Sequence, residues 1–324
     1  MIVLAADIGG THARLGLVET GKGAPRVIAK ESYDSHRVSE PEPLVRQFTA
    51  AHPTPPYTRA AFAVAGPVEG GVSRLPNLDW QLDATALTSA LRIPTMLIND
   101  FVAIGHAVPL LGPDDFVTLQ GGSIPQRAPI AVIGAGTGLG HVFLIWDGTG
   151  YQPHASEAGH ADFAPADALQ VELLAYLRAV YGHVSWERVV SGPGIGEIYR
   201  FLTHKGVAPE QPVVAAEIAA VESAPVIAAH ALAASDALCV AALDVFVRAY
   251  GAQAANFALS VGAQAVFVSG GIAPRILPRL TDGTFAQAFR AKGRFGERLA
   301  TMPVRVVIRD DAGLIGAARA AELS

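Results

Sequence analysis

Two segments of this chain repeat one order of elements: a short apolar strand, a glycine-rich turn and a second strand. In the first segment, Ile2–Ala6 and Ala13–Val18 flank the turn Asp7–Thr11. In the second, Ile130–Ile133 is followed by the turn Gly134–Gly140 and the strand His141–Trp146. Glycine lets a backbone bend sharply and present its N–H groups to a bound anion. The recurrence favours a duplicated α/β architecture, in which two successive segments open with the same hairpin.

The rest of the sequence alternates between strand and helix patterns. Further strands are expected at Arg26–Ser32, Ala61–Val64, Thr95–Ile98, Ala265–Val268 and Val304–Ile308. Helices are expected at Pro43–Ala51, Ala84–Leu91, Asp167–Tyr181, Val214–Val221, Asp236–Leu259 and Leu314–Ala321, and from Phe101 onwards. Strands and helices mixed throughout the chain indicate layered α/β domains. A length of 324 residues is enough for two such domains with their own cores.

Composition argues against several kinds of partner. The net charge is -5 and no dense basic run occurs, so neither nucleic acid nor an anionic membrane is expected as the main partner. The single cysteine, Cys239, makes no intrachain disulfide or cysteine zinc cluster and is expected to be a buried thiol. Charged residues interrupt the apolar stretch Val213–Val261, so no membrane span is expected. The N-terminus lacks a basic segment and reaches Asp7 early, so we expect no secretory signal and predict a cytoplasmic enzyme.

Asp7 stands where the first apolar strand meets its turn. A carboxylate there can orient a water of hydrated Mg²⁺, which prefers oxygen ligands and keeps its waters. Both glycine turns also contain a threonine, Thr11 and Thr137, and this repetition favours two phosphate-binding turns. The alternative is a pair of ordinary hairpins, with Asp7 as a turn former. Neither turn has the spacing of a P-loop or of a Rossmann fingerprint.

Asn99 and Asp100 follow an apolar strand directly. A carboxylate at such a strand end faces the sheet edge where α/β enzymes bind their ligands. A kinase that transfers phosphate to a hydroxyl needs a carboxylate base close to that hydroxyl, so Asp100 is a candidate for this base. The alternative is that Asp100 caps the helix that follows it.

Glu157, His160 and Glu187 form the third candidate group. Carboxylates and imidazoles hold sugars by bonding to adjacent hydroxyl groups, so these residues are candidates for a sugar site. Other interpretations are a solvated loop charge for Glu157, a structural histidine for His160 and a first-turn helix acid for Glu187.

Six blocks of the sequence resemble the motifs of the bacterial glucokinases, in the same order. They are Asp7–Leu15, Leu97–Phe101, Gly134–Gly140, Glu157–Phe163, Glu187–Gly194 and Ser269–Ile272. This family belongs to the hexokinase–Hsp70–actin superfamily. The resemblance therefore implies an α/β protein with two actin-like (ribonuclease H-like) domains flanking an active-site cleft. It also implies a small domain of residues 1–111 plus 303–324 and a large domain of residues 112–302.

The resemblance also assigns roles to individual residues. It implies that the protein phosphorylates glucose at the 6-hydroxyl with ATP and Mg²⁺, as the entry step of glycolysis, and that Asp100 is the base. Asn99, Asp100, Glu157, His160 and Glu187 would bind glucose, and Asp7 would meet Mg²⁺ through water. The residues implied to bind ATP are Ala6, Asp7, Ile8, Gly9, Gly10, Thr11, Gly134, Gly136, Thr137, Gly138, Gly270 and Gly271. A homodimer is suggested by the resemblance alone.

Three positions depart from the family pattern. His12 stands where asparagine is usual, Ala6 replaces a common glycine, and Ala158 replaces the first glycine of Glu-Gly-Gly-His. The sequence leaves open a kinase for fructose, mannose or an amino sugar, a phosphoryl donor other than ATP, a sugar-sensing regulator, and an actin-like ATPase with a protein partner. A regulator normally carries an added DNA-binding segment, and since the first strand is expected to begin at Ile2, we expect none here.

Overall fold

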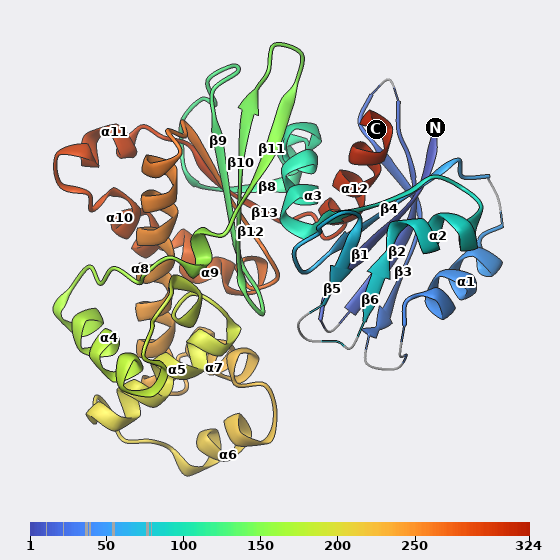
Figure 1. Cartoon of the computed structure of the whole chain (residues 1–324). Coiled ribbons are helices and arrows are strands. Elements are labelled where there is room, and N and C mark those ends of the chain that lie inside the picture. Colours follow the sequence, from blue (N-terminus) through green and yellow to red (C-terminus); the bar gives the residue numbers. More distant parts are fainter. Residues whose placement is uncertain are drawn as a thin grey trace. The chain divides into compact units, whose positions relative to one another are not determined.

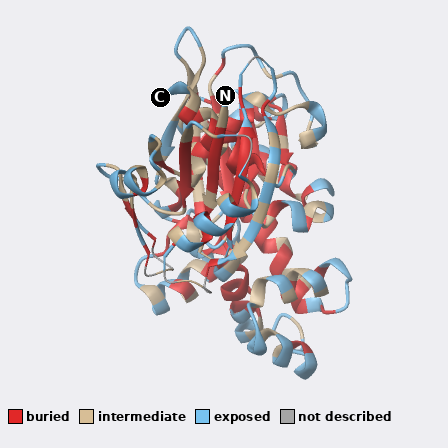
Figure 2. Cartoon of the chain, turned by 90° about the vertical axis from the view of Figure 1, so that its right-hand side faces the viewer, coloured by how far each residue is buried: buried red, intermediate tan, exposed pale blue. Residues whose placement is uncertain are grey.

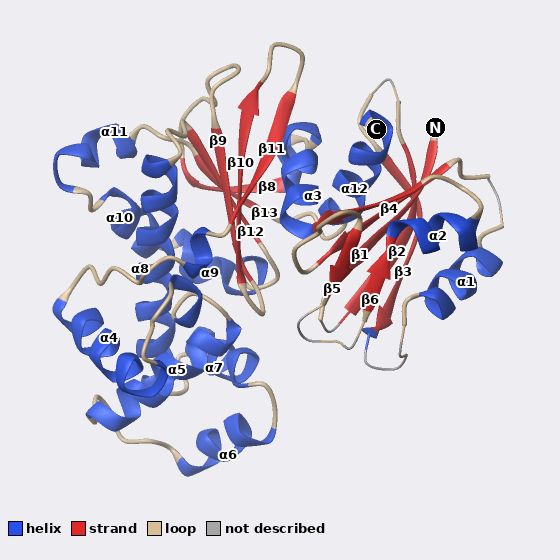
Figure 3. Ribbon diagram, viewed as in Figure 1, coloured by secondary structure: helices blue, strands red, loops and turns tan. Residues whose placement is uncertain are grey.

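The structure is a computed structural model that describes residues 1–10, 12–21, 23–35, 38, 40–53, 56–75, 78 and 80–324 (Figure 1). Internal contacts divide the chain into two compact units. Unit 1 comprises Met1–Asp115, Leu144–Ala155 and Arg309–Ser324, and unit 2 comprises Phe116–Phe143 and Ser156–Ile308. Both units combine strands and helices, as the sequence predicts (Figure 3). The domain boundaries expected from the sequence, residues 1–111 plus 303–324 and residues 112–302, stay a prediction.

Unit 1 contains a five-stranded sheet with the strand order β3-β2-β1-β4-β7. The strands are β1 (Ile2–Ile8), β2 (His12–Glu19), β3 (Arg26–Asp34), β4 (Arg59–Val64) and β7 (Thr95–Asn99). β1, β2 and β3 are antiparallel neighbours, whereas β4 runs parallel to β1 and β7 runs parallel to β4. β1 lies at the centre and is buried on both faces, which explains its apolar sequence from Ile2 to Ala6.

Alternate residues of β1 belong to two different cores, because successive side chains of a strand point to opposite faces. Leu4 and Ala6 pack with the helices α1 (Glu42–Ala51) and α2 (Ala84–Leu91). Val3 and Ala5 pack with α3 (Asp100–Ala107) and α12 (Ala312–Leu323). A small two-stranded sheet of β5 (Val72–Arg74) and β6 (Gln81–Asp83) precedes α2. The sheet of unit 1 is thus covered by helices on both faces.

Unit 2 contains most of a six-stranded sheet with the order β11-β10-β9-β12-β13-β8, whereas the end of β10 and nearly all of β11 lie in the segment Leu144–Ala155 of unit 1. The strands are β8 (Phe116–Gln120), β9 (Ile130–Ala135), β10 (Leu139–Trp146), β11 (Tyr151–Ser156), β12 (Ala265–Ser269) and β13 (Val304–Val307). β12 runs parallel to both β9 and β13, and β8 is antiparallel to β13. β9 and β12 are completely buried, and Figure 2 shows buried residues along the strands.

The helices of unit 2 gather around α8 (Ala237–Ser260), which packs against α5, α7 and α10. The other helices are α4 (Ala168–Tyr181), α5 (Gly192–Lys205), α6 (Pro212–Ala220), α7 (Ser223–Leu232), α9 (Leu277–Thr281), α10 (Thr284–Arg290) and α11 (Gly296–Ala300). By length and composition alone α8 could cross a membrane, but 72% of its most apolar window is buried inside the protein. This helix therefore has the burial of a core helix.

Cys239 lies in α8 and is buried, as the sequence predicts. Burial raises the pKa of its thiol to about 12, so the thiol stays protonated and unreactive.

The structure corrects several element boundaries. Asp7 and Ile8 belong to β1 and not to the turn after it. Gly134 and Ala135 likewise belong to β9, and Gly140 lies in β10, so the second turn is shortened to Gly136–Gly138. Asp7 and Ile8 pair with β2 and β4, and Gly134 pairs with β12, and local sequence does not reveal these contacts.

The two helices on one face of the unit 1 sheet, α3 and α12, pack against each other closely (Figure 1). A Cβ atom added to Gly316 of α12 would lie 1.7 Å from the carbonyl oxygen of Ala103 in α3. Only glycine fits there, because a backbone oxygen cannot move aside without displacing its helix.

We predict that Gly316→Ala destabilises the protein, although alanine is intrinsically the better helix former. Overpacking of this kind typically costs about 1–3 kcal/mol of unfolding free energy, which urea unfolding can measure. Gly150→Ala is the matched control, because an added Cβ there meets no atom within 4 Å. A Gly316→Ala variant as stable as the wild type would contradict the close packing of α3 on α12.

Candidate active site

In unit 1, Asp7 lies near the end of β1, in the first hairpin, and close to the start of α12. It pairs across the strands with Arg14, and Arg14 Nη1 lies 3.6 Å from Asp7 Oδ2. A Cβ atom on Gly313, in the first turn of α12, would lie 2.7 Å from the same oxygen, so glycine lets the helix approach the carboxylate. Burial raises the pKa of Asp7, and the charge of Arg14 partly opposes this rise. The side chain is still 24% exposed, so a ligand can reach it.

The hairpin turn beyond Asp7 is held by backbone and hydroxyl bonds. The Gly9 N–H donates to the His12 carbonyl at 2.9 Å, and the Ser35 hydroxyl donates to the Gly9 carbonyl at 3.2 Å. The side chains of Ala6 and Ile8 are buried in the sheet and belong to the core. Gly9 and Gly10 are partly exposed, His12 is exposed, and Thr11 lies outside the described residues.

Asn99 and Asp100 lie at the carboxyl end of β7, where α3 begins. The Asn99 Oδ1 accepts bonds from the N–H groups of Phe101 and Val102 at 2.9 and 3.2 Å, and its Nδ2 donates to the Gly66 carbonyl at 3.1 Å. Asn99 is therefore the helix cap, and the alternative that assigned the cap to Asp100 is wrong by one residue. Asp100 is the first helical residue, is partly exposed, and accepts a bond from the Phe101 N–H at 2.9 Å.

In unit 2, two glycine turns follow the ends of neighbouring parallel strands. Gly136–Gly138 follows β9, and its ends are joined by a bond of 2.8 Å from the Gly136 N–H to the Gly138 carbonyl. Gly270 and Gly271 follow β12, which pairs with β9 up to Ser269 and Gly134. Thr137 is exposed at the tip of the first turn, whereas Gly134 is buried beneath it. Carboxyl ends of parallel strands are where open α/β sheets bind ligands.

Gly270 brings these two turns together. Its φ angle is +85°, and an added Cβ atom would lie 2.4 Å from the Ala135 carbonyl oxygen. That same oxygen accepts a bond of 3.2 Å from the Ile272 N–H. Glycine is therefore required at this position both for its backbone angle and for the close approach.

Tyr250 of α8 supports both turns from inside the core. Its hydroxyl accepts a bond of 3.0 Å from the Ala135 N–H and lies 3.3 Å from the Ser269 carbonyl oxygen, to which it can donate. The side chain is fully buried, and burial raises the pKa of the phenol, so the hydroxyl keeps its proton. One side chain thus holds the end of β9 and the end of β12 together.

The sugar candidates of unit 2 come from two segments that are paired with each other. The Trp186 N–H donates to the Ala161 carbonyl at 3.0 Å, and the Phe163 N–H donates to the Val184 carbonyl at 2.9 Å. This pairing brings a short 3-10 helix at Ala158–His160 next to another at Trp186–Arg188. Their active-site candidates are therefore neighbours, although they are far apart in sequence.

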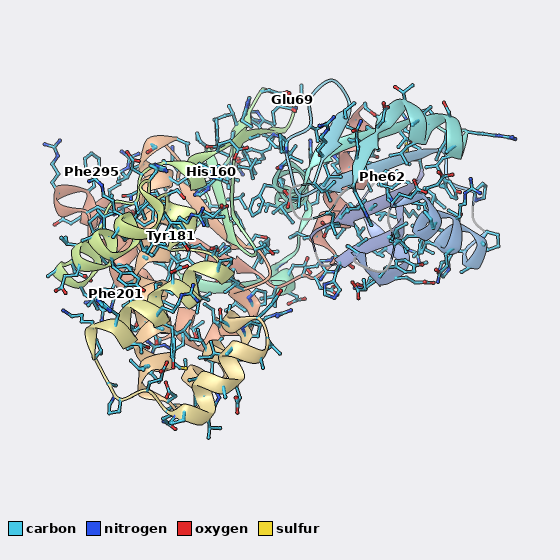
Figure 4. All side chains as sticks on the ribbon, turned by 60° about the horizontal axis from the view of Figure 1, so that its bottom comes forward. Phe62, Glu69, His160, Tyr181, Phe201 and Phe295 are labelled. Atoms are coloured by element: carbon cyan, nitrogen blue, oxygen red, sulfur yellow. The ribbon has the colours of Figure 1, made fainter. Side chains whose placement is uncertain are left out.

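Glu157 and His160 form an exposed pair, with 3.7 Å between Glu157 Oε2 and His160 Nε2. His160 is labelled in Figure 4. Their side chains are 79% and 63% exposed. Glu187 is partly buried, and its Oε2 accepts a bond of 3.0 Å from the Leu139 N–H, directly after the turn Gly136–Gly138. A carboxylate–imidazole pair and a second carboxylate thus lie beside a glycine turn, a donor set suited to sugar hydroxyls.

A buried histidine lies beneath this group. His141 Nε2 is 3.3 Å from Gln253 Nε2, and Gln253 Nε2 lies 3.4 Å from the Ala158 carbonyl oxygen, which accepts its bond. Burial lowers the pKa of His141 to about 3, so its ring is neutral at physiological pH. His141 and Gln253 thus support the 3-10 helix that carries His160.

Comparisons with known proteins agree with this arrangement. A family model described as Glucokinase matches residues 4–324. The glucokinase of Nostoc sp. (strain PCC 7120) is 42% identical, with 98% of each chain covered. The chain belongs to the glucokinase family.

Similar solved structures support the same fold class. The crystal structure of a glucokinase from an Antarctic psychrotroph has a TM-score of 0.85 and 31% identity, covering 100% of this chain and 99% of that one. A ROK family glucokinase from Streptomyces griseus, in complex with glucose and AMPPNP, has a TM-score of 0.69 at 21% identity, with 100% of each chain covered. The resemblance predicted from the sequence is confirmed, as are the actin-like fold class and the assignment to the sugar kinases.

Sequence reasoning missed the supporting residues of this glucokinase-family site. Tyr250 and Gln253 are single polar residues in a largely apolar helix, and Gly313 is one of several glycines near the C-terminus. A polar residue on the buried side of an apolar helix is a weak signal, since the residue that it meets is unknown until the fold is known. The individual roles predicted for the site residues stay predictions.

We predict that Tyr250→Phe destabilises the protein and weakens ATP binding at the predicted glycine turns. Without the hydroxyl, the Ala135 N–H lacks its side-chain acceptor, and leaving a buried group unsatisfied typically costs about 1–3 kcal/mol. Urea unfolding should report this loss, and the KM for ATP should rise while the KM for glucose stays nearly constant.

Tyr199→Phe is the matched control, because Tyr199 is also buried but its hydroxyl lies 3.3 Å from Glu210, away from both turns. The control should leave both KM values unchanged. Equal KM values for ATP in Tyr250→Phe and the wild type would show that the hydroxyl does not position the turns.

Proposed function

We propose that this protein transfers the γ-phosphoryl group of ATP to the 6-hydroxyl of glucose. The observation that carries the proposal is the bond between Glu187 and the Leu139 N–H, which joins a hydroxyl-binding group to a glycine turn. A sugar kinase needs these two parts at fixed positions, because phosphoryl transfer depends mainly on positioning and electrostatic stabilisation.

Glucose is the acceptor that the polar groups of unit 2 suit best. Glu157, His160 and Glu187 offer carboxylate and imidazole atoms, which bond to adjacent hydroxyls. Their proximity supports a role in binding one small polyol, and the glucose in the related Streptomyces griseus structure supports the choice of sugar. A kinase for fructose, mannose or an amino sugar uses the same chemistry and is the alternative.

Asp100 is the proposed base, and the helix cap Asn99 fixes its position. Since Asn99 caps α3, the next residue must begin the helix, and the Asp100 carboxylate is held at the exposed end of β7. In the proposed reaction this carboxylate accepts the proton of the sugar 6-hydroxyl as the oxygen attacks the γ-phosphorus and the bond to ADP breaks.

The glycine turns are the proposed nucleotide contacts. Exposed or partly exposed N–H groups in Gly9–Gly10 and Gly136–Gly138 suit phosphate oxygens, and Gly270 and Gly271 border the adenosine in this proposal. The AMPPNP in the Streptomyces griseus structure supports ATP as the donor.

Mg²⁺ is proposed to bind near Asp7. Among the described residues no group of three His, Cys, Asp or Glu side chains could hold a metal ion, which suits an ion held by phosphates and water. Asp7 offers a partly exposed carboxylate at the positive end of α12, where it can bond to such a water. Bound Mg²⁺ would offset phosphate charge during transfer.

The proposal places the enzyme in the cytoplasm, at the entry of glucose into glycolysis. It requires neither nucleic acid nor a membrane, and a homodimer is the proposed assembly. A sugar-sensing regulator of the same fold is the alternative from another functional class, and it would bind glucose without consuming ATP.

The test is a coupled assay of ADP release across hexoses and donors. We expect glucose with ATP and Mg²⁺ to give the highest kcat/KM, and chelation of Mg²⁺ to abolish turnover. A site that bonds hydroxyls rejects analogues lacking one by up to ~10⁴–10⁵, so 2-deoxy and epimeric sugars should lose more than their size implies. Equal turnover of several epimers would contradict the proposal that these residues recognise the sugar hydroxyls. Glucose binding without turnover would favour the sugar-sensing regulator.

We predict that Asp100→Asn lowers kcat by roughly 10²–10⁴, the usual contribution of a general base, while glucose affinity is mostly kept. The amide retains the shape and hydrogen bonding of the carboxylate but cannot accept the proton. Stopped assays for kcat and calorimetry for glucose binding separate the two effects.

Asp114→Asn is the matched control, since Asp114 is an exposed aspartate in a short 3-10 helix of the same unit. It should behave like the wild type. An Asp100→Asn variant with more than half of the wild-type kcat would show that Asp100 is not the base.

A further inference from the structure

Glu187 touches the predicted phosphate turn at its last residue. Its Oε2 accepts the bond of 3.0 Å from the Leu139 N–H, and a Cβ atom on Gly138 would lie 2.6 Å from the same oxygen. Gly138 therefore leaves the space that the carboxylate occupies. The bond fixes the backbone immediately after the turn, where β10 begins.

A second contact joins the same two segments. The Gly192 N–H donates to the Gly136 carbonyl at 2.8 Å, at the other end of the turn. Val189, between Glu187 and Gly192, packs tightly against the start of α5, since a Cβ atom on Gly194 would lie 2.4 Å from the Val189 carbonyl oxygen. The segment 187–192 thus holds the turn Gly136–Gly138 at both of its ends.

Glu187 still has acceptor capacity for a ligand. A carboxylate offers about four lone-pair sites, and the bond to Leu139 uses one of them. Within the described part of the chain, the hydrogen bond to this side chain goes to Oε2, and the side chain is partly exposed. The carboxylate can therefore hold the Leu139 N–H and a sugar hydroxyl at the same time.

We propose that Glu187 is a positioning residue that couples sugar binding to nucleotide binding, with Gly138 as the position that permits the coupling. A sugar hydroxyl bonded to Glu187 fixes the carboxylate, and the carboxylate fixes the Leu139 N–H and the turn beside it. The nucleotide then meets a turn that is already ordered, so less conformational entropy is lost when it binds. This inference rests on the proposed function, because it takes Glu187 as a sugar ligand and the turn as a phosphate site.

Such coupling is reciprocal and is measured as a ratio of affinities. Binding of one ligand typically changes the affinity for the other by about 5–150-fold when two sites are coupled. The quantity to measure is the Kd of AMPPNP without glucose divided by its Kd at saturating glucose, by calorimetry with Mg²⁺ present. In the wild type we expect this ratio to be about 5 or more.

Gly138→Ala should reduce the ratio to about 1, since the added methyl group displaces the carboxylate from the Leu139 N–H. The fold should tolerate the change, because the atom in the way is the far end of a flexible side chain. In contrast, a Cβ atom on Gly136 meets no atom within 4 Å, so Gly136→Ala changes the same turn without touching Glu187. It should alter AMPPNP affinity equally with and without glucose and keep the wild-type ratio.

Gly121→Ala controls for the substitution itself, because Gly121 lies outside both turns and an added Cβ there meets no atom within 4 Å. It should keep the wild-type affinities. Thermal unfolding of each variant shows whether Gly138→Ala is folded at the temperature of the measurement.

A measurement on the wild type tests the inference without any variant. Hydrogen exchange of a peptide that covers residues 136–142 should become slower when glucose is added alone, because the Leu139 N–H is then bonded to a fixed carboxylate. Unchanged exchange in this peptide at saturating glucose would overturn the inference.

The inference also fails if Gly138→Ala keeps the wild-type affinity ratio, or if the wild-type ratio is 1 while the enzyme phosphorylates glucose. In both cases the proposed function stands. If the wild type consumes no ATP with any hexose, the proposed function fails instead, and glucose-dependent exchange at 136–142 would then belong to a sugar-binding regulator.

Discussion

The peptide of Ala135 is the point on which the arrangement of unit 2 depends. Its N–H donates to the buried Tyr250 hydroxyl, and its carbonyl oxygen accepts the Ile272 N–H while lying against Gly270. The end of β9, the end of β12 and the long helix α8 therefore meet at one residue. Since both turns begin within a few residues of this point, their positions are fixed by the core and not by the flexible parts of the loops. A site built on rigid elements in this way holds its groups more accurately than one built on loops alone.

In unit 1, glycines in the last helix, α12, let the helix approach the elements that carry the candidate site residues. Gly313 lets the first turn of α12 approach Asp7, and Gly316 lets the next turn approach the backbone of α3. The C-terminal helix thus supports the first hairpin of the chain and the helix that begins with Asp100. Neither glycine has a positive φ angle, so what they contribute is the missing Cβ atom and not backbone freedom. This packing gives a physical reason why the segment from Arg309 onwards belongs to the same compact unit as the N-terminus.

Much of this organisation could be predicted from sequence, but within definite limits. The hairpins, most strands and the helix α2 follow from apolar periodicity and turn residues, and α2 has the predicted bounds, Ala84–Leu91. Sequence patterns misplaced the ends of β1 and β9, because Asp7 and Ile8 are strand residues through pairing with β2 and β4, and Gly134 through pairing with β12. The alternative that Asp100 caps α3 placed the cap one residue too late, since Asn99 and Asp100 are both good helix caps and local sequence does not decide between neighbours. The roles of Tyr250 and Gln253 could not be predicted, because Ala135 and Ala158, to which they bond, lie more than 90 residues away in the chain.

The division between exposed and buried polar groups follows from their chemistry. Glu157 and His160 are exposed and weakly paired, so their hydrogen-bonding capacity is available to a ligand. Tyr250 and Gln253 are buried and bonded to backbone atoms, so they fix the backbone without competing for that ligand. Glu187 is the exception, because one side chain is partly buried, bonds to the backbone and keeps lone pairs for a ligand. A carboxylate is suited to this double task, since it accepts several bonds at once, whereas a hydroxyl or an amide has fewer lone pairs with which to accept them.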